Sequence, residues 1–144
     1  MSTNPNPADT DWRDVRGPFD IIGDVHGCAD ELIELLHKLG YTVRLEGEGD
    51  KRRAGTTAPP GRRAFFVGDL VDRGPNSPDV LRIVMDMVAA GQAFCVAGNH
   101  DDKLLRWLRG REVKIGQGLE RTIAQLEGAS DASKARIVAF IESL

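Results

Sequence analysis

The sequence predicts an α/β fold in which parallel strands are flanked by helices. Three times along the chain, a short apolar run passes through a glycine-bearing loop into a helical pattern, at residues 19–40, 64–91 and 93–110. Successive units of this kind imply a parallel sheet with right-handed crossovers. The chain of 144 residues, 41% hydrophobic and 28% charged, has the size and composition of one ordinary globular domain.

The first unit shows both periodicities clearly. Residues 19–22 form a short apolar run that ends at Gly23, as expected of a buried strand that enters a tight turn. A helix should follow, because leucines between residues 32 and 39 recur at the i, i+3, i+4, i+7 spacing of one helical face. Gly40 then stands where the end of a helix favours glycine.

The second and third units repeat this order. Ser77 and Pro78 form an N-cap and first-turn signal for the second helix, and Gly91 and Gly110 follow the second and third helices. The predicted strands are 64–67 and 93–97, the loops are 68–77 and 98–101, and the helices are 78–90 and 102–109. In such a sheet the loops that leave the carboxyl ends of the strands converge on one rim, where ligands bind.

The rest of the chain is less regular. We expect a flexible lead-in over residues 1–17 and a folded domain over 18–144, with a loop excursion rich in glycine, proline and arginine at 44–63. The excursion holds six basic and three acidic residues, so it either attracts a polyanion or serves as a solvated loop. A weak hairpin fits within it. Apolar spacing further predicts a short extended piece near 113–115 and helices near 119–126 and 135–144.

Composition narrows the function classes. The net charge is −3, from 22 acidic and 19 basic residues, which gives no overall attraction to nucleic acid. No apolar run approaches the roughly 20 residues of a membrane span, and residues 1–11 lack the apolar core of a secretion signal. Cys28 and Cys95 are not spaced as a metal knuckle, and Cys95 lies in an apolar run that predicts burial. We therefore expect a cytoplasmic protein without membrane contact.

Three loops carry the residue types that bind metals. They read Gly-Asp-Val-His-Gly at 23–27, Gly-Asp-Leu-Val-Asp-Arg-Gly at 68–74 and Gly-Asn-His-Asp at 98–101. Asp24 and His26 are two residues apart, so at an extended strand end both side chains point to the same side. This mixture of carboxylate, imidazole and carboxamide ligands suits Mn, Fe, Zn or Ni. It does not match the thiolates of a zinc knuckle or the all-oxygen ligands of a calcium loop.

These loops resemble the signature of the calcineurin-like metallophosphoesterases, in the branch shared with serine/threonine protein phosphatases and diadenosine-tetraphosphatase-like enzymes. Residues 19–41, 64–80 and 95–126 are also similar to the phosphatase module of bacterial polynucleotide kinase-phosphatase, an RNA-repair protein. The resemblance implies the N-terminal half of the family's α/β/β/α sandwich. It also implies a hydrolase that acts on phosphomonoesters or nucleotide phosphoanhydrides.

The resemblance further implies a centre of two divalent ions, with Mn as the first expectation and Fe, Zn or Ni as alternatives. Asp24, His26 and Asp69 would hold one ion, and Asp69 and Asn99 would hold the other. Asp69 suits the bridging role because it comes from the middle loop. Two ions about 3.5–4 Å apart would hold a bridging hydroxide in line with the bound phosphorus.

Three further residues take catalytic roles from the same resemblance. Arg73 would bind the substrate phosphate, because a guanidinium presents fixed donors to phosphate oxygens. His100 would protonate the leaving oxygen, with Asp72 orienting its imidazole. The implied substrates are a phosphorylated small molecule, a nucleotide such as a dinucleoside polyphosphate, a phosphoprotein or an RNA 3′-phosphate end.

Histidine usage departs from the family pattern. The family's sites also use two histidines from a second sheet, whereas this sequence has His26, His37 and His100 and carries Gln117 where close relatives often have histidine. We therefore expect the first half of a larger domain, completed by another segment or by oligomerisation. Three hypotheses follow: an active phosphoesterase, an inactive or partial one that binds a nucleotide or RNA end, and an interaction surface on an exposed sheet edge.

Overall fold

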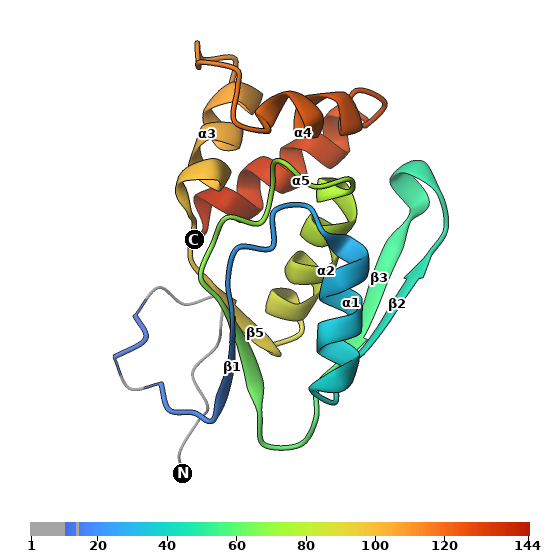
Figure 1. The fold of residues 1–144 in the computed structure, drawn as a ribbon, viewed down its shortest axis with the longest axis vertical. Coiled ribbons are helices and arrows are strands. Elements are labelled where there is room, and N and C mark those ends of the chain that lie inside the picture. The colour runs from blue at the N-terminus through green and yellow to red at the C-terminus, as the bar shows by residue number, and fades with distance from the viewer. Residues whose placement is uncertain (1–10, 14) are drawn as a thin grey trace.

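The computed structural model describes residues 11–13 and 15–144, arranged as Figure 1 shows. The elements in chain order are β1 (Phe19–Ile22), α1 (Ala29–Lys38), β2 (Thr42–Glu46), a 3₁₀ turn (Gly49–Lys51), β3 (Arg53–Thr57), β4 (Arg63–Phe66), α2 (Ser77–Ala89), β5 (Ala93–Cys95), α3 (Asn99–Leu108), α4 (Leu119–Gln125) and α5 (Asp131–Glu142). A parallel sheet has the order β1-β4-β5, and β2 and β3 form a separate antiparallel hairpin. The predicted α/β fold with a parallel sheet and flanking helices is confirmed.

One face of the sheet is buried against α1 and α2. Side chains alternate along each strand, so Ile22, Phe66 and Cys95 join the same hydrophobic cluster as the two helices, at 5%, 0% and 1% exposure. Helix α2 contributes six buried apolar side chains to this cluster, namely Val80, Leu81, Ile83, Val84, Met87 and Val88. Burial of Cys95 confirms its predicted place in the core. None of the described helices has both the length and the apolarity needed to cross a bilayer.

The other face of the sheet is aromatic. Phe19, Phe65 and Phe94 contact one another, with ring centroids 5.9 to 6.2 Å apart. Trp12 lies edge-on to Phe65 and Phe94, with centroids 5.5 and 5.1 Å away. Part of the segment predicted as a flexible lead-in therefore packs on the sheet, while its residues 1–10 and 14 lie outside the described residues.

The hairpin expected within the excursion is present, and α2 holds it through a buried carboxylate. Asp79, in the first turn of α2, is 4% exposed. It accepts two hydrogen bonds from Arg52, at 2.8 and 2.9 Å, and one from Arg82 at 2.8 Å. Because Arg52 directly precedes β3, this bidentate pair fixes the start of β3 beside the N-terminus of α2.

Replacing Asp79 with asparagine should therefore lower stability at neutral pH. Burial raises the pKa of Asp79, but hydrogen bonds from Arg52, Arg82 and Asn76 outweigh burial and hold the pKa below its ordinary value of 3.8. A lowered native pKa gives stability that is complete above the unfolded-state pKa and is lost as the pH falls through the native pKa. We expect Asp79→Asn to lower the free energy of unfolding in urea by about 2 kcal/mol at pH 7, and by less below about pH 4.

Asp102 provides the matched control for this measurement. It pairs with Arg106 on the surface of α3 at 3.2 Å, and its side chain is 60% exposed. Exposed pairs of this kind contribute about 0.5 kcal/mol or less, so Asp102→Asn should barely change the unfolding midpoint. If the two variants were equally stable at pH 7, the role of Asp79 in anchoring the hairpin would be wrong.

Three helix starts and one extended segment differ from the sequence prediction, and one of these is α5, which begins at Asp131 instead of near residue 135. Asn76, not Ser77, caps α2, and its side-chain oxygen accepts the Asp79 N–H at 3.1 Å. α3 begins at Asn99 instead of residue 102, because the Asp101 carboxylate accepts the Gly98 N–H at 2.9 Å and closes the first turn. Residues 111–116 are irregular where the sequence predicts an extended piece, with no described strand paired to them.

Candidate metal centre

The three glycine-bearing loops meet at the carboxyl ends of the strands. The loops that leave β1 and β4 lie side by side, and the His26 N–H donates to the Asp69 carbonyl at 3.0 Å (Figure 1). The third loop is joined to the middle one by Asp101, which is 1% exposed. Its carboxylate accepts the N–H groups of Asp69, Leu70 and Gly98 at 2.8 to 2.9 Å. One buried side chain thus sets the spacing between two of the three loops.

Asp24, His26 and Asp69 form a cluster suited to a divalent ion. One ligand atom from each lies within 4.8 Å of the others. His26 Nδ1 is 2.9 Å from the Val71 carbonyl oxygen, and a carbonyl can only accept, so Nδ1 carries the ring proton and Nε2 keeps its lone pair. The structure therefore brings together the three residues expected to hold the first ion, with Nε2 as the ligand atom that His26 offers.

Asp69 lies between the first and third loops. Its Oδ1 accepts the His100 N–H at 3.1 Å, while its carboxylate also belongs to the cluster with Asp24 and His26. The backbone of Gly98 runs so close to this carboxylate that any Cβ there would collide with Oδ1. Asn99 is the first residue of α3 and is exposed at the same edge; within the described residues its carboxamide forms no hydrogen bond.

His100 and Asp72 form a hydrogen-bonded pair beside the cluster. His100 Nδ1 lies 2.8 Å from Asp72 Oδ2, and Asp72 is fully buried at 0% exposure. The other oxygen of Asp72 accepts the Thr122 hydroxyl at 2.7 Å. The imidazole of His100 meets that of His26 edge-on, with ring centroids 4.8 Å apart. Because Nδ1 donates to Asp72, Nε2 is the atom of His100 that can exchange a proton with a ligand.

Arg73 is exposed next to this pair. Its N–H donates to the Gly118 carbonyl at 3.3 Å, and its own carbonyl accepts from Arg121 at 2.7 Å. Its guanidinium donates no hydrogen bond to any residue that the structure describes, so all its donors are available to a phosphate. The backbone of Arg73 is thus fixed while its charged group stays open to solvent.

Helix α4 holds the middle loop, a role that the sequence analysis did not assign. Thr122 is fully buried, accepts the Asp72 N–H at 3.0 Å and donates to the Asp72 carboxylate. Gln125 donates to the Gly74 carbonyl and accepts the Ser77 N–H, both at 2.9 Å. The one local signal was a threonine on the apolar side of a predicted helix, which by itself does not distinguish a positioning residue from an ordinary helix position.

The backbone of the site is strained. Five of the seven predicted site residues have positive φ angles, a region that residues other than glycine rarely occupy. The angles are 51° at Asp24, 42° at His26, 53° at Asp69, 75° at Asp72 and 74° at Arg73. Each such residue costs on the order of 1–3 kcal/mol, and such strain concentrates at functional sites. The strain therefore supports a functional role for the loops beyond connecting strands and helices.

Comparison with known proteins agrees with this geometry. The calcineurin-like phosphoesterase family matches residues 17–131. The asymmetrical bis(5′-nucleosyl)-tetraphosphatase PrpE of Halalkalibacterium halodurans is 46% identical over 126 residues, which make up 88% of this chain and 48% of that protein. PrpE of Bacillus subtilis is 43% identical over 116 residues, or 81% of this chain and 44% of its own length. The chain thus spans about half the length of the curated relatives it matches.

A solved structure described as "a putative diadenosine tetraphosphatase" shares the fold. It superposes with a TM-score of 0.50 at 23% sequence identity, over 84% of this chain and 41% of the other. The family match covers most of the chain and includes all three loops of the candidate centre. Fold, loops and matched range agree, and they show that the chain belongs to the calcineurin-like phosphoesterase family.

Proposed function

We propose that the protein hydrolyses a phosphoanhydride bond of a dinucleoside tetraphosphate with two divalent metal ions. The observation that carries the proposal is the cluster of Asp24, His26 and Asp69, within 4.8 Å of one another and beside His100. Metal ligands next to a histidine that is oriented by a buried carboxylate suit metal-assisted hydrolysis with acid catalysis. The names of the PrpE relatives supply the substrate class.

The donor set at this centre fits Mn, with Fe, Zn and Ni as alternatives. Asp24, His26 and Asp69 would hold the first ion, and Asp69 and Asn99 would hold the second. The contact of Asp69 with both the first and third loops supports its shared role. When bound, such ions would supply a hydroxide nucleophile at neutral pH and would neutralise charge on the substrate phosphate.

The remaining steps fall to three side chains. Arg73 binds oxygens of the reacting phosphate, which its open guanidinium supports. His100 gives a proton from Nε2 to the oxygen of the departing nucleotide, and Asp72 keeps the ring oriented through Nδ1. Water adds to phosphorus, the anhydride P–O bond breaks, and the products of an asymmetrical cut are a nucleoside monophosphate and a nucleoside triphosphate.

Two alternatives to this reaction must be distinguished from it by experiment. RNA 3′-phosphate ends require the same chemistry, and a site that holds metal and ligand without turnover would make the protein a binding module. The names of the relatives favour the nucleotide over the RNA end. We place the reaction in the cytoplasm, in line with the free thiols of Cys28 and Cys95.

The experiment is a product analysis on metal-stripped protein resupplied with Mn, Fe, Zn or Ni. Diadenosine tetraphosphate should yield AMP and ATP in equal amounts, and yield neither without metal. An RNA oligonucleotide with a 3′-phosphate, assayed in parallel, should release phosphate more slowly. Faster release from RNA would overturn the assigned substrate, and saturable binding of the tetraphosphate without turnover in any metal would reject hydrolysis in favour of a binding module.

A further inference from the structure

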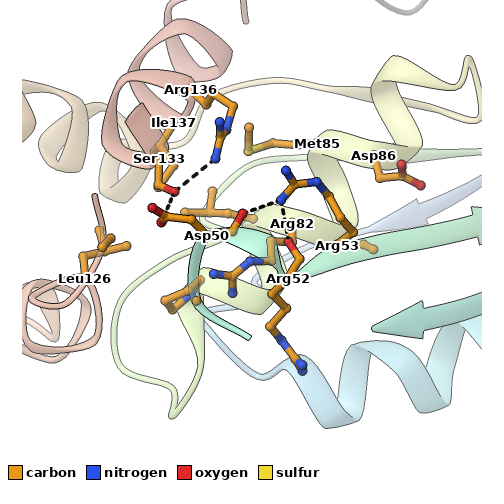
Figure 2. A pocket seen from close by; sticks show the side chains of 15 residues that line it. Asp50, Arg52, Arg53, Arg82, Met85, Asp86, Leu126, Ser133, Arg136 and Ile137 are labelled. Carbon is orange, nitrogen blue, oxygen red and sulfur yellow. Dashed lines mark hydrogen bonds between the residues drawn. The ribbon is translucent and has the colours of Figure 1, made fainter. Parts of the chain in front are cut away.

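A second cavity lies away from the metal centre, between the start of the hairpin strand β3, helix α2 and helix α5. Its volume is about 300 Å³, at the lower end of the range for small-molecule sites. Figure 2 shows its lining side chains, which come from α2 itself and from segments that precede and follow α2 in the sequence. None of the seven residues assigned to the metal centre lines this cavity, so it is a separate site.

The cavity is rich in guanidinium groups. Its walls include four arginines, namely Arg52, Arg53, Arg82 and Arg136. Two of these already form salt bridges, because Arg52 and Arg82 donate hydrogen bonds to Asp79, which does not line the cavity. They still carry two positive charges against the single charge of Asp79. The other two arginines, Arg53 and Arg136, donate to no carboxylate among the residues that the structure describes.

Arg53 and Arg136 keep most of their donors free. Among the residues that the structure describes, neither forms a direct salt bridge. Arg53 Nη1 donates to the carbonyl oxygens of Asp50 and Arg52 at 2.6 and 3.0 Å, and Arg136 Nη2 donates to the Ser133 hydroxyl at 3.1 Å. A guanidinium has five N–H donors. Both groups point into the cavity in Figure 2, from β3 and α5 respectively.

Two carboxylates also line the cavity, and each already has a donor. Asp50 accepts the Ser133 hydroxyl at 2.8 Å, and hydrogen bonds from Ser130 and Ser133, together with the nearby charge of Arg136, hold the pKa of Asp50 below its ordinary value. Asp86 accepts the Thr56 hydroxyl at 2.7 Å. Four guanidinium groups therefore face two carboxylates within the lining, with Asp79 behind it, and the cavity retains an excess of positive charge.

We propose that this cavity binds an organic phosphate of about mononucleotide size. The phosphate would lie on Arg53 and Arg136, whose free planar donors match phosphate oxygens. The apolar part of the ligand would lie against Leu81, Met85 and Ile137, which line the inner wall. A phosphate alone would leave this apolar wall unused, and a purely apolar ligand would leave the remaining N–H donors of the two arginines unused.

Calorimetric titration of AMP into the protein tests the site. The titration is run with chelator, which removes the contribution of bound metal to phosphate affinity, and the double substitution below separates this cavity from Arg73. We expect saturable binding of one AMP per chain, weakened at least about tenfold by the double substitution Arg53→Gln with Arg136→Gln, because two charge-assisted contacts are lost. Arg44→Gln is the matched control, since Arg44 lies on the same hairpin with its side chain 82% exposed and outside the cavity.

Thermal unfolding of each variant checks that the fold is intact, which the exposed positions of Arg53 and Arg136 favour. Absence of saturable AMP binding to the unsubstituted protein would overturn the proposal, as would binding that the double substitution leaves unchanged. Inorganic phosphate provides a further arm. If it bound as tightly as AMP, the apolar wall would contribute nothing and the assignment of an organic phosphate would be wrong.

Discussion

Asp69→Asn is expected to remove metal binding and, with it, hydrolysis. The substitution keeps the shape of the side chain but removes the charge of the ligand that contacts two loops. Loss of a residue that merely supports a metal ligand costs roughly 10–100-fold in affinity or activity, so loss of this shared ligand should cost at least about 100-fold. Elemental analysis and calorimetry on purified protein would give Mn bound per chain, next to the rate of tetraphosphate hydrolysis.

The metal-free proteins supply a second readout for the same substitution. Without an ion, the carboxylates of Asp24 and Asp69 repel each other across a cluster whose ligand atoms lie within 4.8 Å. Metal-free Asp69→Asn should therefore unfold at the same or a higher temperature than the unsubstituted protein, which excludes misfolding as the cause of lost activity. Asp102→Asn, on the exposed side of α3, should bind metal normally. Full metal content and full activity in Asp69→Asn would refute the metal centre.

His100→Ala is expected to slow turnover by about 10²–10⁴-fold while metal content stays unchanged. Metal content should not change because His100 is not one of the clustered metal-binding residues. It is hydrogen-bonded to Asp72 through Nδ1 and lies beside the cluster. A proton donor matters most when the leaving group is basic. The loss should consequently be large for phenyl phosphate, whose phenolate leaving group is strongly basic, and smaller for p-nitrophenyl phosphate, whose leaving group needs little protonation.

His37 offers a matched histidine control for that experiment. It lies on the exposed side of α1, where it accepts the Val43 N–H at 3.3 Å, remote from the three loops in the fold. His37→Ala should keep both activity and metal content. If His100→Ala instead lost its metal, His100 would be a ligand and not an acid. An equal loss for both substrates would likewise exclude protonation of the leaving group.

The strands and the convergence of the loops were predictable because their signals are local. Short apolar runs, leucine spacing and glycine-bounded loops are visible in any window of about ten residues. A parallel sheet then requires loops at the carboxyl ends of its strands to share one rim. The proximity of Asp24, His26 and Asp69 follows from that topology, without knowledge of any side-chain contact.

The features that escaped prediction depend on contacts between distant segments. The sequence places Asp101 in a loop. In the structure its carboxylate accepts the Gly98 N–H, and this hydrogen bond starts α3 earlier than the sequence indicates. Thr122 and Gln125 act on residues 48 to 51 positions before them. Positive φ at Asp72 and Arg73 is also invisible in the sequence, since neither residue type requires it.

The dependence of Asp72 on α4 sets an order of events during protein synthesis. Asp72 is bound to Thr122, which is 50 residues further along the chain. At about 5–20 residues per second, roughly 3–10 seconds separate the two residues as the chain emerges from a ribosome. The parallel sheet and α2 can form in that interval, because their segments precede α4. The loop that carries Asp72 can reach its final shape only after this contact of long sequence separation has closed.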